Sequence, residues 1–364
     1  MNYINIVKKD YETIIKLKGK VSTFIFYKEF MKAFFIYFQE DESKNIPPAL
    51  SFEEVSWIDS NVLPCFISIG IILKRFYKQP LKLYLAYNPT LLQYLETAEF
   101  FLWVGPRLNI FEYDQEYIGG FNLYVKEYNK NFKIEKFNYL PGFYDLNEKE
   151  KELTKFSLLD QLERFDVPRI FGSVFALVMS ADSREYERCI SALAETVCNA
   201  QLYSESDAFV CVQALPLGVH ISLCDIGIGF KESLARKGII LSAEKEYTKY
   251  HNSRVLNNNI LDDFFSIFIA LKYAKETGRV NLWKLKKIIT DNKGTMRIHS
   301  NRIQVVFSSG RCFGCEKNSI EACMDCMLEN FSTDYQKSPL RIYNTKIVGV
   351  HIEIDLKRGG SFDI

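Results

Sequence analysis

The first third of the chain alternates short apolar runs with segments whose apolar residues recur every three or four positions. Ser60 can cap a helix, and Asn88 can cap another that has Pro89 in its first turn. Strands and helices that alternate in this way predict an open α/β layer. The expected strands cover residues 13–19, 48–55 and 81–87, and the expected helices cover residues 24–38, 60–73 and 88–101.

From about Leu153 the pattern changes to longer helices and more hydrophobic strands. Residues 183–203 are predicted to form a helix that buries one apolar face, and two strands are expected over 207–215 and 218–227. Glu195 and Asn199 lie one turn apart on this helix, on the side away from its apolar face. This pair is either part of a site or simply a solvated helix face.

The second of these strands ends in Asp225, followed by Gly227 and Gly229. A buried carboxylate is a strong acceptor for the exocyclic amine of adenine, and glycines let the backbone approach a planar base. Mg²⁺ prefers oxygen ligands, so the amide oxygen of Asn199 is a suitable ligand. Glu195 is then placed to polarise a water molecule for attack on a γ-phosphate.

The Glu–Asn helix "AETVCNA" and the Asp-x-Gly-x-Gly run "CDIGIGF" resemble the first two motifs of the GHKL superfamily, which is named for gyrase, Hsp90, histidine kinases and MutL. The segment "NLWKLKKIITDNKGTMRIHS" is similar to its later helix and Gly-Thr strand, and residues 348–356 to its closing strand. The resemblance covers about residues 165–356. It implies a Bergerat α/β sandwich with a mixed sheet that binds ATP and Mg²⁺. It further implies that Asp225 reads adenine, that Asn199 holds the ion, that Glu195 is the general base and that Thr295 contacts the nucleotide.

The sequence departs from this family at the lid, where a second Gly-x-Gly usually precedes the helix leading to Gly294. Those places hold Arg279 and Asn281, and only Gly278 lies close. A backbone with fewer glycines wraps phosphates less freely, whereas Arg279 offers a phosphate-binding cation. Nucleotide binding is therefore better supported than hydrolysis.

The N-terminal part resembles a STAS domain, the fold of anti-sigma-factor antagonists, over about residues 11–105. The resemblance rests on "VSWIDSNVLP" and "NPTLLQYLETAEF". The phosphoacceptor of that family would fall at Asn61, which cannot accept a phosphate, although Ser60 is adjacent. The alternative is that Asp59 and Ser60 simply begin a helix. The expected domains are a STAS-like domain over 1–105, a connector over 106–150, and a GHKL-type domain over 151–364.

Four cysteines form two Cys-x-x-Cys pairs inside a Cys-rich insertion over 311–331. Four thiolates suit a structural Zn²⁺, although the spacing between the pairs is shorter than usual. An iron–sulfur cluster and an insertion with reduced thiols are the alternatives. A metal here would hold a loop in place rather than take part in catalysis. The four candidate ligands are Cys312, Cys315, Cys323 and Cys326.

The chain has 364 residues, of which 48% are hydrophobic, and a net charge of +1. This length favours two domains, and the charge gives no field that would attract nucleic acid or a membrane surface. The N-terminal residues lack a signal-peptide core, and the most apolar run, residues 62–73, is too short to cross a bilayer. We therefore expect a cytoplasmic protein with neither nucleic-acid nor membrane partners.

Together these features predict a Mg-ATP-binding protein of GHKL type, acting as a regulatory ATPase or a nucleotide-gated switch in signalling. One alternative is a protein-serine kinase of the anti-sigma-factor type that acts on a STAS partner. Another is an interaction module that binds ATP without hydrolysis and changes partners as its lid moves. The expected partners are ATP and either another protein or a second copy of the chain.

Overall fold

The fold was determined as a computed structural model, and it is mixed α/β with two sheets. It describes residues 3–357, except 10–11, 40–45, 115–130, 245–246, 252–254, 277–281, 292, 309–318 and 336. The chain divides into two compact units, each described by itself below. The first comprises residues 1–135 with 211–213 and 343–345, and the second comprises the rest.

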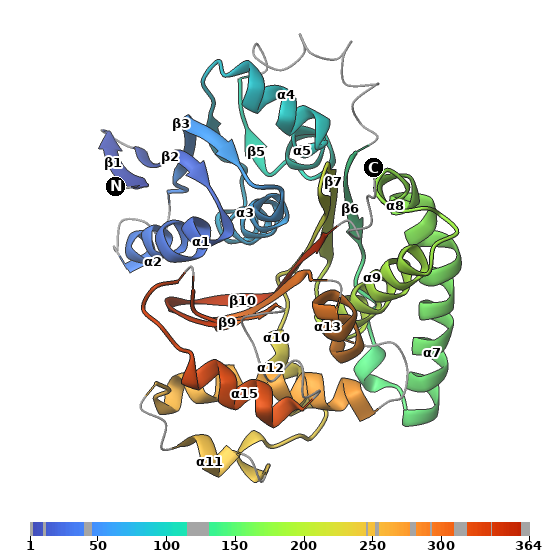
Figure 1. The fold of residues 1–364 in the computed structure, drawn as a ribbon. Helices are drawn as coiled ribbons and strands as arrows, with labels where there is room; N and C mark the ends of the chain where they lie inside the picture. The colour runs from blue at the N-terminus through green and yellow to red at the C-terminus, as the bar shows by residue number, and fades with distance from the viewer. Residues whose placement is uncertain are drawn as a thin grey trace. The chain divides into compact units, whose positions relative to one another are not determined.

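The first unit is built on one five-stranded sheet in the order β1-β2-β3-β4-β5 (Figure 1). β1 is antiparallel to β2, and the other neighbouring strands are parallel. Its elements are β1 (Ile4–Lys9), β2 (Glu12–Val21), α1 (Thr23–Ile25), η1 (Phe26–Phe30), α2 (Met31–Gln39), β3 (Ala49–Ile58), η3 (Ser60–Val62), α3 (Leu63–Tyr77), β4 (Leu81–Tyr84), α4 (Pro89–Thr97), α5 (Phe100–Leu102), η4 (Trp103–Arg107) and β5 (Phe111–Glu112).

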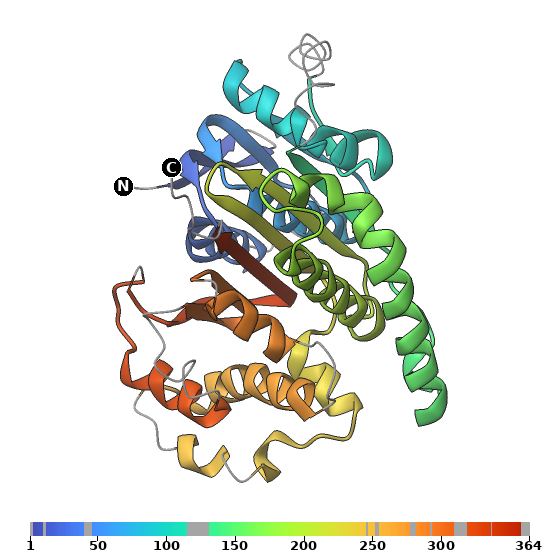
Figure 2. The ribbon, with the colours of Figure 1, turned by 45° about the vertical axis from the view of Figure 1, so that its right-hand side comes forward.

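Helices lie on both sides of this sheet, with α2 and α3 on one side and α4 on the other (Figures 1 and 2). Phe66 of α3 packs edge-on against Phe26 of η1 and Phe52 of β3, with ring centroids 5.1 and 5.2 Å apart. Trp57 of β3 packs against Tyr94 of α4 at 4.3 Å. Since aromatic pairs of this kind are favourable beyond the area they bury, they fix the helices on the parallel strands.

Each strand and helix predicted for this part overlaps an observed one, but β1 and β5 were not predicted. The strand predicted over 81–87 ends at Tyr84, and the helix predicted over 88–101 ends at Thr97 before the short α5. The predicted role of Ser60 also differs from the structure. No side chain caps η3 or α3, and the chain enters α3 through the 3-10 turn of η3. Pro64 lies in the first turn of α3, where its missing N–H costs no hydrogen bond. Ser60 is buried instead of capping the helix.

The second unit holds most of a five-stranded sheet in the order β6-β7-β8-β10-β9, of which residues 132–135, 211–213 and 343–345 are assigned to the first unit. β10 lies antiparallel between β8 and β9. Its elements are β6 (Phe132–Phe137), η6 (Phe143–Asp145), α7 (Glu148–Gln161), η7 (Leu162–Asp166), α8 (Val167–Ala176), α9 (Arg184–Tyr203), β7 (Ala208–Leu215), β8 (Gly218–Asp225), α10 (Gly229–Arg236), η8 (Leu241–Ala243), α11 (Tyr247–His251), α12 (Asn258–Glu276), α13 (Leu282–Asp291), β9 (Thr295–Ser308), α15 (Ile320–Glu329) and β10 (Leu340–Lys357).

A contiguous layer of helices accompanies this sheet. α12 and α13 pack against β9, α13 contacts α9, and α10 contacts α12. Figure 2 shows α12 and α13 running beside β9 and β10. α7 and α8 pack on α9 in turn. The helix α9 is therefore held between the sheet's helical layer and two further helices, which buries its polar residues Glu195 and Thr196.

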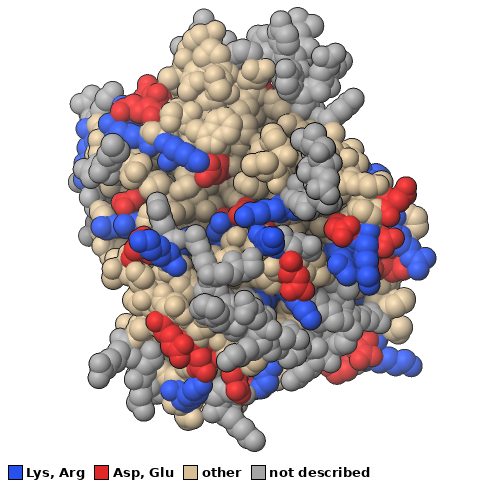
Figure 3. Space-filling model, in the orientation of Figure 1, with Lys and Arg blue, Asp and Glu red and all other residues tan. Residues whose placement is uncertain are grey.

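The surface carries both signs of charge. On the face drawn in Figure 3, Lys and Arg are interspersed with Asp and Glu among the described residues. This agrees with a net charge close to zero. None of the described helices has the length and apolar composition needed to cross a bilayer.

Candidate functional site

A pocket in the second unit lies between the sheet and the helices α9, α10, α12 and α13. Its apolar wall is formed by side chains from β8, β10, α10 and α13. Its polar groups come from α7, α9, the end of β8 and the residue after α10. The apolar residues include Leu223, Leu234, Leu282, Val350 and Ile352, and the charged or amide residues are Lys155, Glu195, Asn199, Asp225 and Lys237.

Glu195 and Asn199 line the pocket together, one turn apart on α9. Ser183 caps this helix by accepting a hydrogen bond from the backbone N–H of Tyr186 at 3.1 Å. Asn199 Nδ2 donates to Glu195 Oε1 at 3.3 Å. Glu195 is 2% exposed, so its charge is inside the fold rather than on a solvated helix face. A buried carboxylate needs a compensating cation or donor.

Lys155 of α7 supplies that cation. Its Nζ lies 3.1 Å from Glu195 Oε1 and 3.5 Å from Asn199 Oδ1. The second carboxylate oxygen, Glu195 Oε2, is buried and has no hydrogen-bond partner among the described residues. Amide and carboxylate oxygens are both donors that Mg²⁺ accepts, either directly or through its waters. These residues therefore fit a divalent cation.

Asp225 is the last residue of β8 and is held by two backbone donors. The N–H groups of Gly227 and Val350 both donate to Asp225 Oδ1, at 2.9 and 3.3 Å. Burial raises the pKa of Asp225 from its ordinary value of 3.8 to about 7, and the two backbone hydrogen bonds oppose this rise. Because both donors reach Oδ1, Asp225 Oδ2 is the oxygen left to meet a ligand in the pocket.

Glycines make this arrangement possible. Gly349 of β10 has φ +88, and a Cβ there would lie 2.1 Å from the carbonyl oxygen of Asp225. A Cβ on Gly227 would lie 1.7 Å from the carbonyl oxygen of Ser204 at the end of α9. Gly229 has φ +71 and lines the pocket, whereas Gly227 ties the loop to α9. Glycine is thus required at both motif positions, at Gly227 by the close approach of another backbone and at Gly229 by the left-handed φ.

The other sequence-predicted site residues are placed differently. Thr295 begins β9, opposite Asp355 of β10, and is not among the residues that line the pocket. A Cβ on Gly294 would lie 2.5 Å from the carbonyl oxygen of Asp355, so this glycine serves the tight entry into β9. Gly278 and Arg279 lie outside the described residues.

Sequence reasoning missed Lys155, Lys237, Tyr203 and Gly349. Lys155 lies 40 residues before Glu195 on a largely polar helix, and no motif marks it. Lys237 Nζ lies 3.6 Å from the ring centroid of Tyr203, which is one turn beyond Asn199. Desolvation of its ammonium and, to a smaller extent, the charge of Lys155 lower the pKa of Lys237 to about 8, although the residue as a whole is exposed. Of these four residues, only Gly349 could have been noticed in the sequence, as the glycine within the strand segment "VGVHIEIDL".

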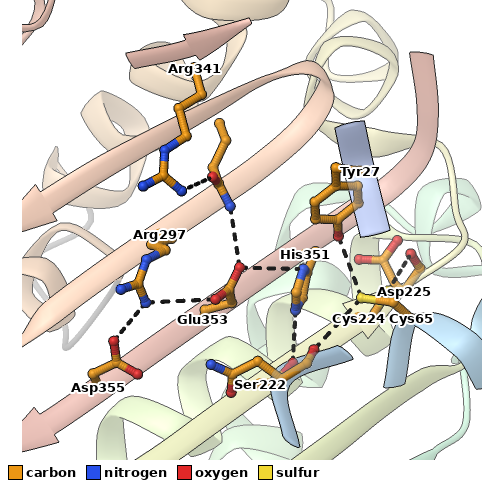
Figure 4. Close-up of polar contacts among 12 residues, drawn as sticks. Tyr27, Cys65, Ser222, Cys224, Asp225, Arg297, Arg341, His351, Glu353 and Asp355 are labelled. Carbon is orange, nitrogen blue, oxygen red and sulfur yellow. Dashed lines mark hydrogen bonds and ion pairs between the residues drawn. The ribbon is translucent and has the colours of Figure 1, made fainter. Parts of the chain in front are cut away.

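A second polar cluster joins β8, β9 and β10 (Figure 4). Ser222 Oγ and His351 Nε2 are 2.8 Å apart, and His351 Nδ1 lies 3.9 Å from Glu353 Oε1. Gln304 Nε2 donates to Glu353 Oε1 at 3.2 Å, and Arg297 Nη1 lies 3.6 Å from Glu353 Oε2. The order Ser–His–Glu is that of a hydrolytic triad, but Ser222 is fully buried inside β8. A nucleophile must meet its substrate, so this cluster is structural.

Of the four predicted metal-binding cysteines, the structure describes two. Cys323 and Cys326 are buried on α15, where Lys286 Nζ lies 3.3 Å from Cys323 Sγ and Asn330 Nδ2 lies 3.5 Å from Cys326 Sγ. Cys312 and Cys315 lie outside the described residues. Within the described part of the chain, no group of three or more potential metal ligands comes together.

Comparison with known proteins adds no relative: no family, curated protein or solved structure matches this chain. The interpretation of the pocket therefore depends on its own geometry.

Proposed function

We propose that the second unit binds Mg-ATP in the pocket between α9 and the end of β8, as GHKL proteins do, and acts as a regulatory ATPase or nucleotide-gated switch. The observation that carries this proposal is the convergence of Glu195, Asn199 and Asp225 on one cavity. Their elements are separated in sequence, and the residue types are those that the chemistry of ATP requires.

Adenine recognition is assigned to Asp225. An apolar wall with one buried carboxylate suits a flat base whose edge carries a single amine donor. Leu223, Val350 and Ile352 provide that wall. Asp225 Oδ2 would accept the amine hydrogen bond, since Oδ1 already accepts two backbone hydrogen bonds.

The ion and the reaction are assigned to α9. Asn199 Oδ1 would hold Mg²⁺, which would neutralise charge on the phosphates, and the buried Glu195 Oε2 would be the oxygen left to meet a water. For hydrolysis, Glu195 would take the proton of the attacking water. The water oxygen bonds to the γ-phosphorus while the bond from that phosphorus to the ADP oxygen breaks.

The experiment that tests this function separates binding from turnover. Isothermal titration with Mg-ATP and with ADP measures binding, and phosphate release measures hydrolysis. Glu195→Gln keeps the size and one acceptor oxygen but removes the base, so we expect ATP to bind while phosphate release falls at least about 100-fold. Exposed Glu187 on the same helix gives the matched control, Glu187→Gln. Absence of ATP binding in the wild-type chain would refute the proposal, and binding without turnover would favour the switch over the ATPase.

We also propose a structural Zn²⁺ held by the four cysteines of the insertion. The support is that Cys323 and Cys326 are buried, three residues apart on α15. Elemental analysis of the purified chain should give one zinc ion per chain, and this zinc should be lost in Cys323→Ser/Cys326→Ser. Buried Cys211 is the control, because Cys211→Ser should leave the zinc content unchanged. A wild-type chain without zinc would contradict this assignment.

A further inference from the structure

We propose that Lys155 and Lys237 are the phosphate-binding cations of this pocket, an inference that rests on the proposed nucleotide function. Among the described residues lining the pocket, these two are the only Lys or Arg side chains. They come from separate elements, Lys155 from α7 and Lys237 from the residue after α10. The sequence had pointed instead to Arg279 for this role.

The two lysines lie against successive turns of α9. Lys155 contacts Glu195 and Asn199, and Lys237 lies over the ring of Tyr203, four residues beyond Asn199. The turn from Glu195 to Asn199 is the part of the pocket assigned to the ion, and Tyr203 follows on the next turn, whereas Asp225 belongs to the wall at the end of β8. A nucleotide with its base on Asp225 would thus direct its phosphates toward the two ammonium groups.

The electrostatics of the free pocket favour an anion between the two lysines. The positive charge of Lys155 disfavours protonation of Lys237, so the two ammonium groups repel each other. A polyphosphate placed between them would turn this repulsion into two attractions, in a site partly shielded from water where charge pairs are stronger than in solvent.

Lys155 can make this contact without leaving Glu195. An ammonium has three donors, and the structure uses one on Glu195 Oε1 at 3.1 Å. The second contact, to Asn199 Oδ1, is the longer at 3.5 Å. When an ion takes the Asn199 oxygen, Lys155 has donors to turn toward a phosphate.

The test compares ATP with adenosine, which lacks the phosphates. ATP affinity is measured by calorimetry and adenosine affinity by ligand-detected NMR, for the wild type, Lys155→Met and Lys237→Met. Lys149→Met is the control, because Lys149 is an exposed lysine on α7 that does not line the pocket. Each pocket variant should lose about 10-fold or more in ATP affinity, the value of a hydrogen bond to a charged group, and keep its adenosine affinity. Lys155→Arg should recover most of the loss.

The outcomes distinguish a failure of the lysine assignment from a failure of the proposed nucleotide function. If the wild type binds neither ATP nor adenosine, the proposed function fails and this assignment fails with it. If the wild type binds both and the lysine variants bind ATP equally well, only the assignment of the lysines is overturned. An equal loss of ATP and adenosine, restored by neither Lys155→Arg nor Lys237→Arg, would also overturn it, because the lysines would then only support the pocket wall.

Discussion

Asp225 shows how much of the site depends on single atoms. Its two oxygens have different surroundings, because backbone donors hold Oδ1 and Oδ2 is left for the ligand. Burial raises the pKa of Asp225 to about 7, so the folded chain holds a proton there between about pH 4 and 7 that the unfolded chain has released. The stability that this proton contributes is fully present below the ordinary pKa and is lost as pH rises through 7.

The variant Asp225→Asn should therefore weaken ATP binding without lowering the stability of the fold. The variant keeps the Oδ1 acceptor but presents an NH₂ donor to the donor edge of adenine, so ATP affinity should fall at least about 10-fold. Its melting temperature should be no lower than that of the wild type at pH 8, where Asp225 is a buried charge. The difference in melting temperature between the variant and the wild type should shrink as pH falls to 5, because Asp225 is then protonated.

Melting curves at pH 8 and pH 5, with ATP titrations at pH 8, check both parts. Asp145 in η6 is exposed and away from the pocket, so Asp145→Asn is the control. Unchanged ATP affinity in Asp225→Asn would remove Asp225 from the adenine site.

At the scale of elements, the strand β10 is what brings the pocket together. It supplies Val350 and Ile352 to the apolar wall, and its bend at Gly349 lets it approach the carbonyl oxygen of Asp225. The helix α9 approaches from the other side, with Gly227 packed on its last turn. The pocket thus needs two close backbone contacts that only glycine permits.

Gly349→Ala should damage the pocket through the backbone. The left-handed φ of +88 and the close approach to Asp225 are both unfavourable for a residue with a Cβ. We expect a loss of about 1–3 kcal/mol in the free energy of unfolding, together with weaker ATP binding. Gly142 also has a positive φ, +79, but a Cβ added there would have no described atom within 4 Å.

Denaturant titration of Gly349→Ala and Gly142→Ala compares these two cases. Backbone strain alone would destabilise both variants equally and leave ATP binding intact. A larger loss in Gly349→Ala, accompanied by weaker binding, would assign the difference to the contact with Asp225.

Periodicity was enough to place α9 and β8, because apolar residues repeat there at helical or strand spacing. The helix α13 and the start of β9 were expected only from the resemblance of residues 281–300 to the GHKL motifs. Lys155 was not predictable, since α7 is largely polar and leaves Leu153 and Phe156 exposed. Its role depends on how α7 packs against α9, which no local pattern records. The π-helical turn η1 inside the predicted helix 24–38 was missed for a similar reason, since side-chain spacing does not reveal it.

At the scale of the whole molecule, ligand binding should raise the stability of the folded chain. A ligand that binds only the folded state adds about 2.7 kcal/mol at a concentration of 100 times its dissociation constant. We expect the melting temperature of the full chain to rise with the logarithm of Mg-ATP concentration. In Asp225→Asn the same rise in melting temperature should need at least about 10-fold more Mg-ATP.

Thermal shift assays with Mg-ATP, and with Mg-GTP as the matched control, measure this effect. Guanine carries a carbonyl oxygen where adenine has its amine, so it would meet Asp225 with an acceptor and should stabilise far less. An equal shift with both nucleotides would indicate binding through the phosphates alone.

The polar cluster of Ser222, His351 and Glu353 has a consequence for how the chain finds its fold. Along β10, His351 and Glu353 alternate with Ile352 and Ile354, which therefore belong to the opposite face of the sheet. A slip of one residue against β8 would turn Glu353 toward the apolar wall and leave His351 without its serine. A misaligned pairing of β10 with β8 would thus be unfavourable on both faces of the sheet, so the cluster favours the native register of these strands.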